Sequence, residues 1–132
     1  MITESDCTIY NKYLVGRVET WQRVQIEGVH WEQRHAREGS EDNDFTLVFI
    51  PFARGDDYLK PREWQALASK SEYWTLQIGD VIVKGLISDE LVAGTFTLSN
   101  LKAAYDDVLM VASVDTRDFG SSALQHWEVT AR

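Results

Sequence analysis

The 132-residue sequence lacks several features that define whole classes of protein. It has a single cysteine, Cys7, so a disulfide-stabilised scaffold is excluded, and a reducing compartment is indicated. Its longest apolar runs, residues 47–50 and 108–112, fall far short of the roughly 18 residues of a transmembrane helix. The first six residues contain neither a basic nor an apolar stretch, so we expect no secretory signal. We therefore expect the protein to be synthesised in the cytoplasm.

Basic residues are also scarce, with 13 Lys and Arg against 21 Asp and Glu, a net charge of −8. This balance repels phosphate groups and acidic lipids, so we expect no membrane binding and no sequence-specific nucleic-acid binding. What the sequence does contain is 44% hydrophobic and 11% aromatic residues, enough for a hydrophobic core. No Pro-, Gly- or Ser-rich linker interrupts the chain, so we predict one domain over residues 1–132.

Alternation of apolar and polar residues with a period of two dominates the chain and predicts a mainly β fold. Residues 20–27 alternate, and the pattern resumes at 29–32, so Gly28 marks a bulge or bend within one long strand. We expect about six to seven antiparallel strands in a small β-barrel or, alternatively, a two-layer β-sandwich. The other predicted strands span residues 8–13, 45–50, 81–87, 109–115 and 124–130.

One short α-helix is predicted at about residues 99–108. Ser99 can act as its N-cap, and apolar residues recur at helical spacing from Leu101 to Val108. We expect this helix to cover an open end of the barrel. A further helix of one or two turns is allowed after Pro61.

The tripeptide His-Trp-Glu occurs twice, at residues 30–32 and 126–128. In a strand the His and the Glu share one face, so pairing of the two strands in register would gather His30, Glu32, His126 and Glu128 as a divalent-metal set. The favoured interpretation is simpler: both Trp residues fill the core, and the His and Glu residues lie on the solvated face. We therefore predict no metal site. The four residues remain the candidate ligands of the alternative interpretation.

No other pattern indicates catalysis or a cofactor. Cys7 has no accompanying nucleophile motif, the eight glycines are scattered singly, and the neighbouring carboxylates Asp56-Asp57 and Asp106-Asp107 fit solvated loops and helix ends. We predict a protein that is not an enzyme and needs no cofactor. A metal-binding or enzymatic β-domain built on the two His-Trp-Glu strands is the alternative from another class.

Short motifs spread over nearly the whole chain resemble those of an uncharacterised family of small proteins encoded in tailed bacteriophages and prophages. They occupy, in order, residues 8–13, 20–23, 28–32, 48–52, 73–85, 113–121 and 125–129. Their layout is similar to that of β-barrel head-closure and head–tail connector proteins. The resemblance implies a virion structural protein, made in the bacterial host cytoplasm, that assembles as a ring between portal and tail.

The same resemblance implies portal or adaptor and tail proteins as partners, and self-association on assembly; a minor capsid or tail component is the alternative. Exposed loops longer than about 12 residues in a compact domain are often functional. We therefore expect interaction loops in the acidic stretch around residues 38–44 and in the irregular segment 53–70. Their candidate residues are Glu38, Glu41, Asp42, Asp44, Arg54, Asp56 and Asp57.

Overall fold

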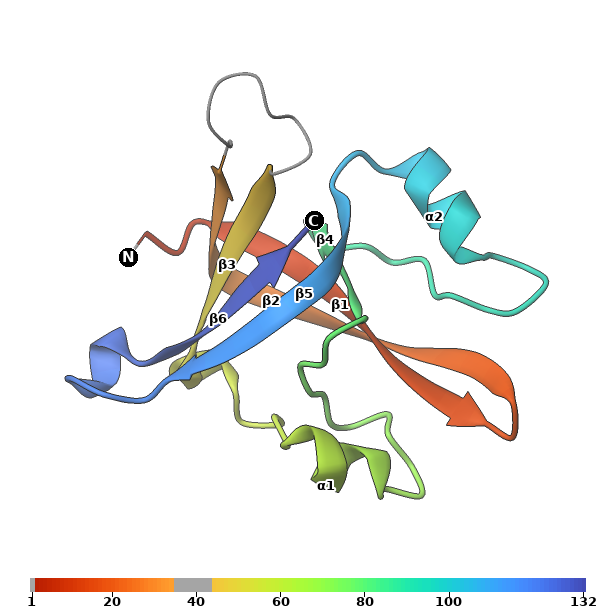
Figure 1. The fold of residues 1–132 in the computed structure, drawn as a ribbon, viewed down its shortest axis with the longest axis horizontal. Helices are drawn as coiled ribbons and strands as arrows, with labels where there is room; N and C mark the ends of the chain where they lie inside the picture. The colour runs from red at the N-terminus through yellow and green to blue at the C-terminus, as the bar shows by residue number, and fades with distance from the viewer. Residues whose placement is uncertain (1, 35–43) are drawn as a thin grey trace.

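The computed structural model describes residues 2–34 and 44–132, and it is a closed antiparallel β-barrel (Figure 1). Six strands follow each other around the barrel in the order β1-β2-β3-β6-β5-β4, and β4 returns to β1. The prediction of a mainly β fold with a small barrel is confirmed, and the sandwich alternative is wrong. The strands are β1 (Ser5–Val15), β2 (Val18–Arg34), β3 (Phe45–Pro51), β4 (Val81–Lys84), β5 (Val108–Arg117) and β6 (His126–Ala131).

Strand β2 is long enough to serve two partners. Its first part forms a hairpin with β1, in a register that runs from Val15 opposite Val18 to Ser5 opposite Val29. Its last part, from His30 to Arg34, pairs with β3. Gly28 lies between the two parts with φ +75°, where the register with β1 shifts, so the predicted bulge in one long strand is confirmed.

Side chains alternate between the barrel interior and its outer wall. Ile9 and Ile82 belong to the interior cluster, whereas their neighbours Tyr10 and Val81 belong to a second cluster outside. The interior is apolar and is completed by residues from every strand of the barrel. The fully or nearly buried members are Cys7, Ile9, Ile26, Val29, Val48, Ile50, Trp74, Leu76, Ile82, Val111, Trp127, Val129 and Ala131.

Helix α2 (Leu98–Ala104) lies against the outer wall formed by β1 and β4, not over an open end as predicted. Its buried residue Leu101 packs in the outer cluster with Tyr10 and Val83. The predicted N-cap Ser99 is wrong, because Thr97 caps the helix. The Thr97 side chain accepts a hydrogen bond from the Asn100 N–H, and the Asn100 side-chain oxygen accepts one from the Thr97 N–H. The helix also ends before residue 108, since β5 begins there.

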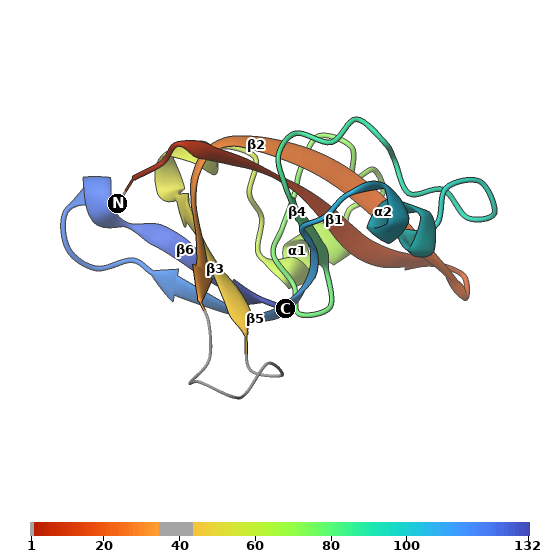
Figure 2. The ribbon, with the colours of Figure 1, turned by 90° about the horizontal axis from the view of Figure 1, so that it is seen from above.

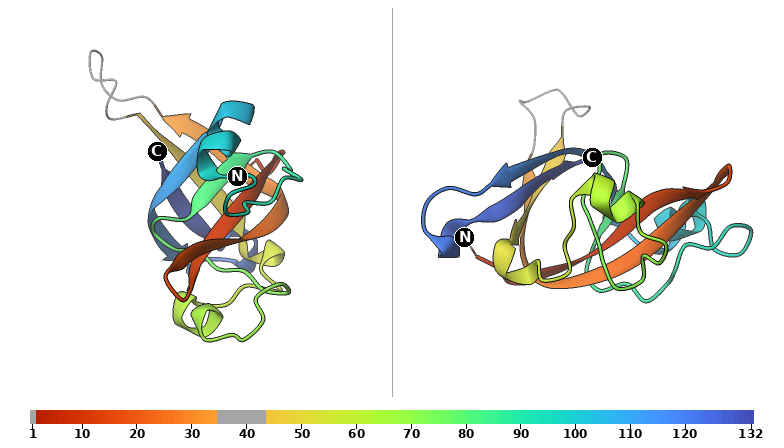
Figure 3. Two further views of the ribbon diagram at one scale, coloured as in Figure 1. Left: turned by 90° about the vertical axis from the view of Figure 1, so that its right-hand side faces the viewer. Right: turned by 90° about the horizontal axis from the view of Figure 1, so that it is seen from below.

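The segment between β3 and β4 lies below the barrel in Figure 1 and fills one end of its interior. It contains a 3-10 turn, η2 (Phe52–Arg54), and the short helix α1 (Pro61–Gln65), which starts at the predicted proline. Figure 3 shows this segment from the side and from below. Trp74 enters the interior and meets Trp127 edge to face, with ring centroids 5.7 Å apart.

Strand β4 is shorter than predicted, ending at Lys84 rather than residue 87. Gly85 follows with φ +97°, a conformation that turns the chain away from the barrel. Ile87 is still buried, because the chain beyond the turn packs onto the outer cluster. In the described parts of the chain, no helix is long and apolar enough to cross a membrane.

Candidate functional site

The two His-Trp-Glu strands are not neighbours in the barrel, because β3 lies between β2 and β6. Their Trp residues face inward as expected: Trp127 is buried in the interior, and Trp31 packs against it. Phe49 of β3 is opposite His30 on one side and Glu128 on the other. The pairing in register that a four-residue metal set requires is therefore wrong.

The ring of Phe49 separates the two imidazoles. It stacks on His30 with centroids 5.2 Å apart and contacts His126 at 4.9 Å. In each histidine Nδ1 lies 2.8 Å from a backbone carbonyl, of Ile2 and Leu124 respectively. A carbonyl can only accept, so both Nδ1 atoms carry the proton.

The two glutamates of these tripeptides are held by arginines. Glu32 pairs with Arg34 at 2.7 Å, and Glu128 pairs with Arg117 at 2.9 Å. Among residues 2–34 and 44–132, no group of three or more His, Cys, Asp or Glu side chains is placed to hold a metal ion. What the two tripeptides form is an aromatic and charged strip across the outer wall.

This strip borders a pocket of about 500 Å³, which we call the outer groove. Phe119 and Leu124 line it and are 70% and 59% exposed, an unusual degree for large apolar side chains that lie together. The ion pair between Arg117 and Glu128 forms its polar side. The full lining is Phe49, Arg117, Phe119, Gly120, Leu124, His126 and Glu128. Of these lining residues, the sequence patterns had indicated only His126 and Glu128 as candidates.

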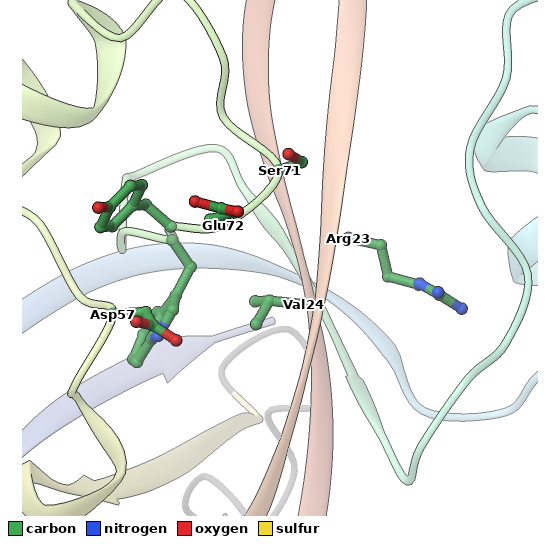
Figure 4. Close-up of a pocket in the computed structure, with 7 residues that line it drawn as sticks. Arg23, Val24, Asp57, Ser71 and Glu72 are labelled. Atoms are coloured by element: carbon green, nitrogen blue, oxygen red, sulfur yellow. The ribbon is translucent and has the colours of Figure 1, made fainter.

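A second pocket, of about 460 Å³, lies beside β2 and the segment before β4 (Figure 4). Asp57 and Glu72 are on one side of β2, while Arg23 points away on the other. Arg23 donates to the carbonyls of Ile87 and Ser88 and so is engaged outside the pocket. The arrangement places the predicted loop residue Asp57 at a surface pocket but gathers no acid–base pair there.

Of the two predicted interaction loops, the structure describes the second but only the end of the first. Glu38, Glu41 and Asp42 lie outside the described residues, whereas Asp44 is an exposed residue just before β3. Arg54, Asp56 and Asp57 are all exposed, on the segment that follows β3. Their role as contacts remains a prediction.

Two glycines near this segment lie in close contact with side chains. The guanidinium of Arg54 fills the space that a Cβ at Gly28 would require. The indole of Trp127 does the same at Gly55. The turn after η2 is therefore fitted tightly to β2 and β6.

A buried polar network ties β1 to the residues before β4, and nothing in the sequence patterns indicated it. Asp80 is 1% exposed and accepts hydrogen bonds from Asn11 Nδ2, Lys12 N, Gln77 N and Gln77 Nε2 at 2.8–3.0 Å. Burial raises the pKa of Asp80 to about 6, although these hydrogen bonds lower it. Asn11 also bonds Thr75 through both its amide atoms. The network fixes the path of the chain into β4.

Residues 7–10 of β1 pair with β4, and the β1–β2 hairpin extends beyond them. Its turn, residues 14–18, is called the hairpin tip below. Leu14, Val15 and Val18 are 62%, 59% and 55% exposed there, beside the exposed Arg17. At the base of this extension Tyr13 meets Trp64 of α1 edge to face at 5.7 Å, which holds the hairpin in place.

Comparison with known proteins yields one finding. A protein-family model described as a family of unknown function (DUF6751) matches residues 2–132. Neither the curated proteins nor the solved structures give a match.

Proposed function

The chain belongs to the family of unknown function DUF6751, and we propose that it is a non-enzymatic structural subunit of a tailed bacteriophage or prophage. In this proposal it is a head-closure or head–tail connector subunit of the virion. It assembles as a ring between portal and tail, with portal or adaptor and tail proteins as partners. The ordered motifs along the chain support the viral setting, and the barrel agrees with the layout of connector proteins.

The observation that carries the assembly role is the hairpin tip. Leu14, Val15 and Val18 are more than half exposed at the end of a paired, anchored hairpin. Contiguous apolar residues at such a position lose contact with water when a partner covers them, so they favour association. A closed barrel behind the hairpin supplies a rigid base. A projecting contact element on a rigid body supports the role of an assembly subunit.

The charge of the chain supports the same role. Each subunit carries a net charge of −8, and a ring multiplies that charge around its channel. Like charge keeps a DNA duplex from adhering to the channel wall while it passes through. An acidic wall therefore suits a connector through which DNA is packaged and ejected.

The test is deletion of the gene in an inducible prophage, followed by electron microscopy and titration of the particles. We expect DNA-filled or leaking heads without attached tails, and restoration of tailed particles by the gene supplied in trans. A variant with Asp106→Asn, an exposed change outside both the hairpin tip and the outer groove, serves as the complementation control and should restore as well as the parent. Normal infectious particles from the deletion strain would overturn the proposal.

A further inference from the structure

Two exposed apolar surfaces lie at opposite ends of the molecule. The hairpin tip is at one end of the longest axis, and the turn η3 (Ser122–Leu124), beside the outer groove, is at the other (Figures 1 and 2). The tip presents Leu14, Val15 and Val18, and the groove presents Phe119 and Leu124. One surface projects and the other is hollowed, so their shapes are of opposite kinds.

The charges of the two surfaces are also opposite. The tip contains one charged residue, the exposed Arg17, and so carries a charge of +1. The groove is lined by Arg117 and Glu128, and two further carboxylates flank it: Asp115 lies 3.8 Å from Arg117, and the exposed Asp118 lies between the lining residues Arg117 and Phe119 in the chain. Together these four residues carry a net charge of −2. Opposite potentials favour the encounter of these surfaces over pairing of tip with tip or groove with groove.

The size of the groove fits such an insertion. Its volume of about 500 Å³ lies within the roughly 300–1,000 Å³ of pockets that bury whole ligands. Its lining includes Phe49 and His126, whose ring centroids are 4.9 Å apart. Aromatic lining residues suit branched aliphatic side chains, which the tip supplies, and the flanking carboxylates suit Arg17.

We propose that the hairpin tip of one copy of the chain inserts into the outer groove of a second copy, so that copies join head to tail. Leu14, Val15 and Val18 then cover Phe119 and Leu124, and Arg17 meets the carboxylates of Asp115 and Asp118. Each copy offers one tip and one groove, so the contact joins unlike surfaces and repeats from copy to copy. Such contacts close into rings when the rotation between copies allows it. The inference rests on the proposed function and names the surfaces that build the ring.

The single native cysteine makes a direct test possible. Cys7 is fully buried, and burial raises the pKa of its thiol, so it does not react in the folded chain. Cysteines introduced one at a time by Val18→Cys at the tip and Ser121→Cys beside the groove are then the reactive thiols. The two purified variants are mixed, oxidised at high chain concentration and analysed by non-reducing electrophoresis. Ala103→Cys, on the exposed side of α2, supplies the matched control.

We expect the mixed disulfide between Val18→Cys and Ser121→Cys to form in large excess over either homodimer and over every pair that includes Ala103→Cys. Charge reversal by Arg17→Glu should lower its yield about tenfold, equivalent to about 1.4 kcal/mol. Asp118→Arg on the groove partner should restore it. The doubly substituted chain, Val18→Cys with Ser121→Cys, should give a ladder of crosslinked oligomers.

Two results would overturn the inference. A dominant tip-to-tip disulfide would show a symmetric dimer, and a mixed yield no higher than that of the control would show that the groove receives another partner or none. Neither result touches the gene deletion, which tests the proposed function separately. Tailless particles from the deletion strain, without the mixed disulfide, would retain the connector role and reject this contact. The mixed disulfide together with normal particles from the deletion strain would retain the contact and reject the connector role.

Discussion

Asn11 and Asp80 are 69 residues apart in the chain, yet Asn11 Nδ2 lies 2.8 Å from Asp80 Oδ2 in the wall of the barrel. This hydrogen bond and its neighbours fix where the long segment after β3 rejoins β1.

Asp80→Ala should lower the free energy of unfolding by about 3 kcal/mol at pH 5, because buried N–H donors on Asn11, Lys12 and Gln77 lose their acceptor. Urea denaturation followed by tryptophan fluorescence measures this. Asp118→Ala, an exposed change, is the control and should stay within about 0.5 kcal/mol of the parent. Equal stability of the two variants would contradict the structural role of Asp80.

The pKa of Asp80 makes stability depend on pH. Burial raises it to about 6 in the folded chain from an ordinary value of 3.8, so folding favours the protonated form. The resulting stabilisation is fully present below about pH 4 and is lost as the pH rises through 6, a change of about 3 kcal/mol. Asp80→Asn should lack this component of the stability profile. An NMR titration of the Asp80 carboxyl with a midpoint below 4 would contradict the prediction.

The start of α2 offers a matched pair of hydroxyl residues two positions apart. Thr97→Ala removes the cap of the helix and should lower the free energy of unfolding by about 1 kcal/mol. Ser99→Ala alters an exposed position within the helix and should be neutral or slightly stabilising, because alanine has the higher helix propensity. Thermal and urea denaturation of both variants decides the point; a larger loss at Ser99 would place the cap there instead.

Gly55→Ala should lower the free energy of unfolding by about 1–3 kcal/mol through overpacking, since the new methyl group meets the indole of Trp127. Its backbone φ of −103° adds no strain, so packing alone acts. Gly16→Ala is the converse control, with φ +64° and open space around the new Cβ, and should lose only about 1–2 kcal/mol from the backbone. The two losses should differ in kind: Trp127→Leu should reduce the Gly55→Ala loss and leave the Gly16→Ala loss unchanged.

Saturating zinc or nickel should leave the melting temperature of the protein unchanged, because Phe49 separates His30 from His126 and each neighbouring glutamate binds an arginine. Differential scanning calorimetry with and without a chelator measures this. A rise with metal that His30→Gln or His126→Gln abolishes would show that the histidines of the outer wall do bind an ion.

Local pattern predicted the elements of the fold well. Alternation over residues 20–27 and 29–32 predicted one long strand with a bulge at Gly28, and in the structure Val24, Ile26, Val29 and Trp31 all belong to or pack against the interior cluster. Alternation depends on the two-residue period of a strand and needs no knowledge of neighbours. The cap of α2 was missed because Thr97 and Ser99 are both good capping residues, and only the reciprocal bond with Asn100 distinguishes them.

The candidate site was predicted less well, for a physical reason. The tripeptides at His30 and His126 share a pattern, but whether they meet depends on the order of strands in the barrel, which no local pattern contains. The outer groove joins β3, β5, η3 and β6, and the hairpin tip becomes a projection only because β4 is too short to accompany β1 along its length.

By itself, the sequence determined a cysteine-poor, acidic β protein with one long bent strand, because composition and period-two burial act residue by residue. Only the tertiary structure decided what those strands bring together. Closure of the barrel inserted β3 between the two His-Trp-Glu strands and buried Asp80 against Asn11. It also left the hairpin tip and the segment before η3 exposed at opposite ends of the molecule, since pairing across the barrel and not local preference determines which apolar side chains are covered.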